Sequence, residues 1–188
     1  DDNIFFFFFT TTRAGFHKYT FSSASTAHII LDLKHRDEVI ESSIKMINNH
    51  TVVGLRRSKA WANDQYVYFA IEFSVPFKTA DIWKDEKTLT DGRDEHGKNL
   101  KACFSFDKKM VMVKVALSGV SIEGAQRNLA KELPGWDFEK VKTDAKNVWN
   151  AELSKIDVNS NDNKQLRTFY TALYHTMIVP NINMDVDK

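Results

Sequence analysis

The stretch Gln65-Tyr-Val-Tyr-Phe-Ala-Ile-Glu-Phe73 alternates between two kinds of side chain along its whole length. Four apolar residues recur at every second position and would share one face: Val67, Phe69, Ile71 and Phe73. Tyr66, Tyr68 and Glu72 would point the other way. A period of two, rich in β-branched and aromatic residues, is typical of antiparallel sheets packed face to face. The stretch therefore predicts a strand of a β-sandwich.

Other stretches before Gly119 carry similar strand patterns. They are residues 5–12, 16–22, 28–33, 40–47, 51–57, 100–106 and 111–117. The polar stretch 84–99, with Asp91-Gly92 and His96-Gly97, is typical of a turn or hairpin tip. Five consecutive phenylalanines, Phe5 to Phe9, break the alternation of a half-buried strand. Either both faces of that strand are covered, or the run departs from the natural sequence.

From Ser121 onward the apolar residues recur with the period of an α-helix. Ser121 and Asp137 are predicted to cap two helices, the first of which ends at Pro134-Gly135. Asp162 and Gln165 form a capping pair for a third helix. Strands followed by a block of helices indicate a β-domain joined to a helical domain, rather than an alternating α/β sheet.

The third helix has an apolar stripe that requires a partner surface. Its members recur at helical spacing: Leu166, Phe169, Tyr170, Leu173 and Met177. Pro180 is expected to end this helix, because proline lacks the backbone N–H. Only eight residues follow Pro180, so we expect the chain to be a piece of a larger protein.

Composition limits the function classes. The chain has 188 residues, and its 26 Lys and Arg nearly balance 25 Asp and Glu, which argues against a nucleic-acid partner. Cys103 is the single cysteine, so an internal disulfide is excluded, and no histidine in its segment could activate the thiol. No apolar run is long enough to span a membrane, and the apolar N-terminal run is too short for a signal peptide.

Several motifs, in this order, resemble one enzyme family. They are Thr10-Thr-Thr-Arg-Ala-Gly-Phe-His-Lys-Tyr-Thr-Phe21, Gly54-Leu-Arg-Arg-Ser-Lys-Ala-Trp-Ala-Asn-Asp-Gln-Tyr-Val-Tyr-Phe69, Glu72-Phe-Ser-Val-Pro-Phe77, Ser121 through Phe138, Val148-Trp-Asn150 and Phe169-Tyr-Thr-Ala-Leu-Tyr-His-Thr176. Together they resemble the exo-acting α-mannosidases of glycoside hydrolase family 92, from about residue 10 to residue 187.

The resemblance implies a secreted, periplasmic or extracellular two-domain enzyme. Its N-terminal β-sandwich would join, through linking helices, an (α/α)₆ barrel that carries the catalytic site. The family hydrolyses α-mannosides in glycans with inversion and needs Ca²⁺, which grips the terminal mannose. Inversion uses two carboxyl groups about 6.5–9.5 Å apart, one as general acid and one as general base.

The chain departs from the family pattern at both ends. The Gly- and Pro-rich opening segment is absent, and so is most of the barrel, where the family keeps its general acid, general base and calcium ligands. We therefore expect a truncated sandwich over 1–119, linking helices over 120–160 and the start of the catalytic domain over 161–188. No catalytic residue or metal ligand is assigned here, the missing helical domain is the expected partner, and the chain alone is expected to be inactive.

Three residues near one predicted loop are candidates for substrate binding. Trp61 lies in the loop 58–65 and could stack on a sugar face, although plugging the end of the sandwich is the favoured interpretation. Arg56 and Gln65 could bind hydroxyl groups across the same loop, or could simply meet water.

Tyr174 and His175 end the third helix, where the interface with a barrel would form a wall of the active site. Packing between domains is the alternative role for this pair. Asp185 and Asp187 alternate like calcium ligands, but they lack the Gly and distal Glu of a calcium loop, so no metal is assigned. The histidines also lack the spacing of a zinc site.

Two other functions compete with the hydrolase interpretation. A non-catalytic carbohydrate-binding sandwich is suggested by Trp61 and the aromatic strand faces. An interaction module, whose apolar helix docks a partner, is the third hypothesis.

Overall fold

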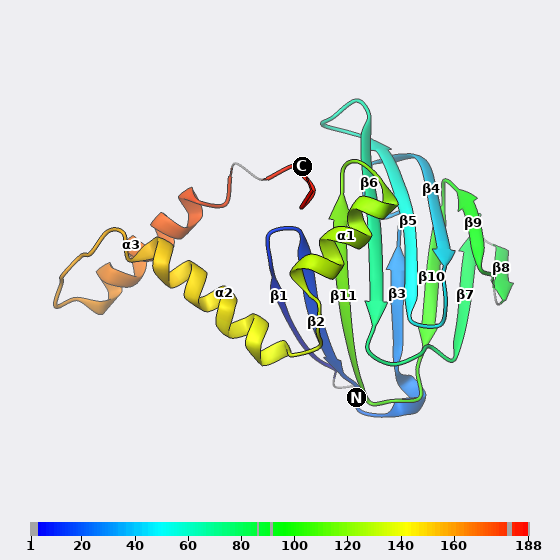
Figure 1. Cartoon of the computed structure of the whole chain (residues 1–188), viewed down its shortest axis with the longest axis horizontal. Helices are drawn as coiled ribbons and strands as arrows, with labels where there is room; N and C mark the ends of the chain where they lie inside the picture. The colour runs from blue at the N-terminus through cyan, green and yellow to red at the C-terminus, as the bar shows by residue number, and fades with distance from the viewer. Residues whose placement is uncertain (1–3, 86, 91, 180–181, 188) are drawn as a thin grey trace.

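The computed structural model describes residues 4–85, 87–90, 92–179 and 182–187. Within this part the chain forms two antiparallel sheets followed by three α-helices (Figure 1). The first sheet is seven-stranded; its strands, in spatial order, are β1 (Phe5–Thr10), β2 (Ala14–Thr20), β11 (Met110–Ser118), β6 (Gln65–Phe73), β5 (Thr51–Lys59), β4 (Glu38–Met46) and β9 (Asp94–Gly97). The second is four-stranded: β3 (His28–Asp32), β10 (Leu100–Ser105), β7 (Thr79–Lys84) and β8 (Lys87–Thr90). A short 3₁₀ helix, Ala24–Thr26, precedes β3.

The main apolar core lies between the two sheets. Strand β6 contributes Phe69, Ile71 and Phe73 to this core, which confirms the face predicted from their alternation. The rings of Phe73 and Phe104 meet across the sheets, with centroids 5.1 Å apart. Gly54 lets β5 pass close to its neighbours, because a Cβ there would lie 2.0 Å from the Ser43 carbonyl oxygen. The predicted β-sandwich followed by helices is thus confirmed.

Helix α1 (Ile122–Glu132) covers the outer face of the seven-stranded sheet (Figure 1). Ser121 caps it as predicted, accepting a hydrogen bond from the Gly124 N–H at 3.0 Å. Its residues Ala125 and Leu129 are buried in a second core together with Ala70 of β6. The outer face of this sheet is therefore a packed face.

Helices α2 (Phe138–Leu153) and α3 (Asn163–Thr176) extend away from the sandwich (Figure 1). Asp137 caps α2 by accepting the Lys140 N–H at 2.9 Å, and Asp162 caps α3, so both predicted caps are confirmed. Helix α3 packs on α2 through Trp149 and Tyr174, whose ring centroids are 4.6 Å apart.

Helix α3 contains no buried residue. Phe169, Tyr170 and Leu173 of its apolar stripe are half-buried, so the described residues leave part of the stripe open. Pro180, which was expected to end this helix, lies outside the described residues, and α3 itself ends at Thr176.

Residues 79–99 form more strands than their sequence pattern predicts. The polar stretch 84–99 does contain a hairpin turn, but it also contributes β8 and β9, and β7 before it was missed. Strand β9 joins the edge of the large sheet, where His96 is the register partner of Ser43. Strand β8 forms a hairpin with β7, and β9 pairs with the distant strand β4. Local alternation cannot reveal such short polar strands, because pairing with their neighbours stabilises them.

Strand β1, with the phenylalanine run, lies at the edge of the large sheet beside β2. The side chains of Phe5 to Phe8 are between 47% and 63% exposed. The described residues therefore leave both faces of this strand largely open. Whether the chain divides functionally near residues 119 and 160 stays a prediction.

Candidate functional site

The β5–β6 hairpin loop holds Trp61 out in solvent, where it is fully exposed. The interpretation that Trp61 plugs the end of the sandwich is therefore wrong. The β5–β6 hairpin extends past the end of the sheets (Figure 1). Arg57 binds Asp64 at the base of the loop through two hydrogen bonds of 2.7 Å. This bidentate pair fixes the loop and holds the pKa of the Asp64 carboxyl below its usual value.

A cleft of about 490 Å³ lies beside this hairpin, at the same end of the large sheet. It is bounded by the β1–β2 turn, the start of β6, the end of β11 and the segment 182–185. Gln65, predicted as a substrate-binding residue, lines this cleft together with Tyr66 and His17. The structure thus places Gln65 in a concave surface close in sequence to Trp61.

His17 gives the cleft a half-buried imidazole on β2. Its Nδ1 lies 3.3 Å from the hydroxyl of Tyr19, and its ring lies beside those of Phe6 and Phe8, at centroid distances of 5.7 and 5.6 Å. Burial lowers the pKa of His17 below its ordinary value of 6.5. The imidazole is consequently neutral at pH 7 and can both donate and accept a hydrogen bond.

One wall of the cleft is fixed by a polar cluster at the end of α1. Glu132 accepts hydrogen bonds from the Thr11 hydroxyl at 2.5 Å and the Arg13 N–H at 2.9 Å, and pairs with the Arg13 guanidinium at 2.7 Å. Arg13 also donates to the carbonyl oxygen of Met184. The cluster therefore ties the β1–β2 turn to α1 and to the C-terminal segment.

The opposite wall depends on Asp185, which is only 7% exposed. Its carboxylate accepts hydrogen bonds from Ser118 Oγ at 2.7 Å and from Asn128 Nδ2 at 2.8 Å. Asn128 in turn accepts the Val186 N–H at 2.9 Å. Gly124 allows this approach, because a Cβ there would lie 2.2 Å from the Asp185 carboxylate.

The carboxylates of Asp185 and Asp187 do not fit a calcium site. Both oxygens of Asp185 accept from protein donors, and Asp187 pairs with Arg127 at 2.6 Å. Among the residues that the structure describes, no group of three or more His, Cys, Asp or Glu side chains could hold a metal ion.

The remaining predicted residues lie elsewhere. Arg56 donates to the carbonyl oxygen of Leu33 at 2.9 Å and to Ser58 Oγ at 2.9 Å, so its guanidinium holds the β3–β4 connection. Tyr174 and His175 lie on α3, well apart from the β5–β6 hairpin in Figure 1. The structure therefore groups Trp61 with Gln65 alone, and a substrate role for any of these residues stays a prediction.

Sequence reasoning missed His17 and Arg13 as cleft residues. Both belong to the motif Thr10–Phe21, but alternation alone predicts His17 to be a surface residue of a strand. The described lining offers amide, imidazole and hydroxyl groups, and its one carboxylate, Asp185, is occupied. Such a surface can bind a hydrogen-bonding ligand, whereas acid–base catalysis would need carboxyl groups from another part of the protein.

Comparisons with known proteins cover the chain almost end to end. The family model described as the glycosyl hydrolase family 92 N-terminal domain matches residues 1–118, and the model of the catalytic domain of that family matches residues 124–188. One curated relative, an uncharacterized secreted glycosidase of Arthroderma benhamiae, is 42% identical over 74 residues. That match covers 37% of this chain and 10% of the relative.

Solved structures are similar over most of the chain. A family GH92 α-mannosidase from Bacteroides thetaiotaomicron superposes with a TM-score of 0.91 and 32% identity, over 98% of this chain and 26% of its own. A family GH92 inverting mannosidase from the same species, at 23% identity and a TM-score of 0.85, shares the fold; 95% of this chain and 24% of that protein are covered. The chain thus spans about a quarter of the length of these structures.

Proposed function

Because the chain belongs to glycosyl hydrolase family 92, we propose that it forms the sandwich and linking helices of an exo-acting α-mannosidase that acts on glycans. The observation that carries this proposal is the likeness to an α-mannosidase over 98% of the chain at 32% identity. The parent protein would release mannose with inversion and would require Ca²⁺, bound by residues outside the described part of this chain. Secretion to the periplasm or the extracellular space is supported by the description of the fungal relative.

The sandwich would contribute one wall of the mannose site. Trp61 stands free on a loop that the Arg57–Asp64 pair holds in place, and Gln65 opens into the neighbouring cleft. An indole can stack on the C–H face of a sugar ring while an amide binds its hydroxyl groups. Asp185, the one acid of the described cleft lining, is engaged with Ser118 and Asn128, so the general acid and base would come from the helical barrel.

Mannose release by a longer chain that includes the whole catalytic domain tests the proposal. With saturating Ca²⁺ we expect hydrolysis of α-1,2-, α-1,3- or α-1,6-linked mannobiose, and β-mannose as the first product seen by proton NMR, because inversion reverses the anomeric configuration. A chelator should abolish this activity, and the present chain alone should show none. The proposal fails if the calcium-loaded longer chain releases no mannose from any of the three substrates.

Replacing Trp61 tests the role of the sandwich in the same assay. Trp61→Ala should raise KM with little change in kcat if the indole only binds the substrate. Trp149→Phe is a suitable comparison, because it changes a half-buried tryptophan that packs on Tyr174. An unchanged KM for Trp61→Ala would remove Trp61 from the substrate wall.

A non-catalytic carbohydrate-binding role is the second candidate, and the full exposure of Trp61 favours it. In that case the present chain should bind mannobiose by itself at millimolar concentration, and Trp61→Ala should abolish the binding heat. The absence of heat at these concentrations would count against this role.

A further inference from the structure

A second hollow lies on the opposite side of the sandwich from α1. The strands β3, β10 and β7 turn one row of side chains, including Ile29, Ala80 and Phe104, into the core between the sheets. The alternate row points outward, and there the structure forms a hollow of about 630 Å³. Its lining combines one indole, one aliphatic side chain and five polar or charged side chains: Trp83, Ile30, Asp32, Lys34, Asp85, Asn99 and Lys101.

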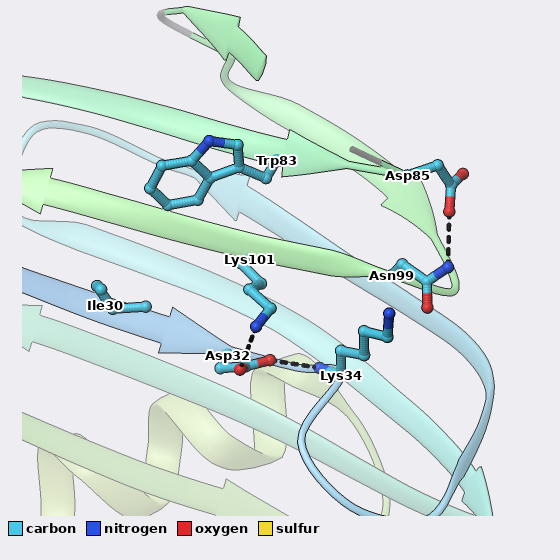
Figure 2. Close-up of a pocket in the computed structure, with 7 residues that line it drawn as sticks. All are labelled: Ile30, Asp32, Lys34, Trp83, Asp85, Asn99 and Lys101. Atoms are coloured by element: carbon cyan, nitrogen blue, oxygen red, sulfur yellow. Dashed lines mark hydrogen bonds and ion pairs between the residues drawn. The ribbon is translucent and has the colours of Figure 1, made fainter. Parts of the chain in front are cut away.

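The register of the sheet explains why these groups meet. Lys101 on β10 is the partner of Asp32 on β3 and of Trp83 on β7. Because neighbouring strands are about 4.8 Å apart, this row extends about 10 Å across the sheet. Figure 2 shows the indole of Trp83 on the same side of the sheet as Lys101 and Asp32. The row is therefore flat, aromatic at one end and charged at the other.

The Asp32 carboxylate of the hollow is already engaged on both oxygens. Lys101 Nζ lies 2.7 Å from Asp32 Oδ2, and the backbone N–H of Lys34 donates to Asp32 Oδ1 at 2.8 Å. Burial works to raise the pKa of Asp32, but these hydrogen bonds outweigh it and hold the pKa below the ordinary value. Asp32 is thus ionised at neutral pH and has a fixed orientation.

A second row lies at the ends of the strands. Asn99 donates to Asp85 at 2.8 Å, and Asp85 has a left-handed backbone with a φ of 47° (Figure 2). The side-chain carbonyl oxygen of Asn99 accepts no hydrogen bond from the described residues. It offers a hydrogen-bond acceptor to a ligand on the flat row.

The charge balance narrows the class of ligand. Two carboxylates and two ammonium groups line the hollow, so it gives neither an anion nor a cation a net attraction. A metal ion is disfavoured because Asp32 and Asp85 are each engaged with protein donors. An aromatic face beside fixed donors and acceptors instead suits a neutral ring compound with many hydroxyl groups.

We propose that the outer face of β3, β10 and β7 binds a neutral oligosaccharide. One sugar ring stacks on Trp83, and its neighbour donates and accepts hydrogen bonds at the Asp32–Lys101 pair and at Asn99. This site lies on the other sheet from the cleft near Gln65, and it does not require the proposed mannosidase activity. It would hold a glycan on the sandwich, apart from any reacting bond.

Titration calorimetry of the full chain with α-1,6-mannotriose and with cellotriose tests the site, up to about 10 mM sugar, because single-site affinities of this kind lie in the millimolar range. We expect at least one of the two sugars to bind. Trp83→Ala should weaken binding at least about tenfold, since the stacked ring loses its partner. Asp32→Asn, which keeps the shape of the side chain, should also weaken sugar binding. It takes the place of Trp83→Ala in this test if circular dichroism shows the Trp83→Ala protein to be unfolded.

Trp149→Ala is the matched control, because it removes a half-buried indole on α2, outside this hollow. It should leave the affinity within about twofold of the unmodified chain. Binding that is lost in Trp61→Ala and kept in Trp83→Ala would overturn the proposal, as would no heat with either sugar. Tighter binding of trigalacturonate than of both neutral sugars would also overturn it. In the longer chain, Trp83→Ala should leave mannose release from mannobiose unchanged, so the two proposals can fail separately.

Discussion

Two ionisable side chains are buried on the outer side of the large sheet, and each is matched by its own partners. Lys114 is 3% exposed; it pairs with Glu72 at 2.8 Å, donates to the Leu133 carbonyl oxygen at 3.0 Å and lies 4.2 Å from the ring centre of Trp136. Asp185 is held by Ser118 and Asn128. A buried charge is costly without such partners, so these residues fix where α1 and the C-terminal segment lie.

Asp185→Ala should destabilise the fold by about 2–3 kcal/mol, because two charge-assisted hydrogen bonds are lost and the Asn128 amide stays buried. Urea unfolding followed by circular dichroism would measure this change. Asp187→Ala is the matched control; it removes a half-exposed pair with Arg127 and should cost less than about 1 kcal/mol. Equal losses of unfolding free energy in the two variants would contradict the stabilising role assigned to Asp185.

The two partners of the Lys114–Glu72 pair are expected to differ in how much stability their replacement costs. Glu72→Gln should cost about 2–3 kcal/mol, because the buried ammonium loses its counter-charge. Lys114→Met should cost about 1 kcal/mol, since the Glu72 side chain is 38% exposed and can turn to water. Thermal unfolding of both variants measures the difference. A larger loss of stability for Lys114→Met than for Glu72→Gln would show that Lys114 stabilises the fold mainly through its contacts to Leu133 and Trp136.

At the scale of elements, the strands and helix caps that depend on neighbouring residues could be predicted from the sequence. The alternation in Gln65–Phe73 and the caps Ser121 and Asp137 are encoded within a few residues, and the structure confirms them. Strand β7 was missed because its stability comes from pairing with β10. Trp61 was misplaced for a similar reason, since the reach of a hairpin beyond a sheet depends on where the other strands end.

The candidate cleft was harder to predict than the strands. Gln65 was selected from its loop, but His17 and Asp185 reach the same cleft from segments far apart in the chain. Alternation places His17 on a face of β2, yet it does not say which part of that face the second sheet leaves open. Residues from separate elements can be assigned to one site only when the order of the strands is known.

The contact between α1 and the β1–β2 turn predicts a dependence of stability on pH. Burial alone would raise the pKa of Glu132, but hydrogen bonds from Thr11 and Arg13 outweigh it and hold the pKa below its ordinary value of 4.5. A lowered pKa in the folded state stabilises the fold above about pH 4.5, and this contribution disappears as the pH falls through the folded pKa.

Glu132→Gln should therefore cost about 1–2 kcal/mol at pH 7, and its difference from the unmodified chain should shrink as the pH falls below about 4.5. Urea unfolding between pH 7 and about pH 3 follows this change. Glu139→Gln on α2, which removes an exposed pair with Lys142, should show little effect at any pH. A Glu132→Gln deficit that persists unchanged at pH 3 would contradict the ionic origin of this contact.

The described part of the molecule has two apolar cores and one helix, α3, that lies outside both. The first core fills the space between the sheets, and the second lies between the large sheet, α1 and the start of α2. Helix α3 belongs to neither; it packs on α2, and its Tyr170 hydroxyl donates to the carbonyl oxygen of Ile156 in the α2–α3 connection at 3.2 Å. No helix in the described part of the chain is long and apolar enough to cross a membrane. The stripe on α3, which the described residues leave half-buried, suits a protein surface, and the helical barrel of the proposed mannosidase is the one we infer.

Hydrogen exchange of the α3 amides tests this inference at the scale of the whole protein. In the present chain they should exchange far faster than those of α1, because Ala125 and Leu129 of α1 are buried and α3 has no buried residue. In a longer chain that carries the complete catalytic domain, the barrel should cover Phe169 and Leu173 and slow α3 exchange at least tenfold, while α1 stays unchanged. Leu173→Asp in the longer chain should restore fast exchange in α3, whereas Thr171→Asp, at an exposed position two residues earlier, should not. Equally fast exchange of α3 in both chains would mean that the stripe binds another partner, and the placement of the barrel against it would be wrong.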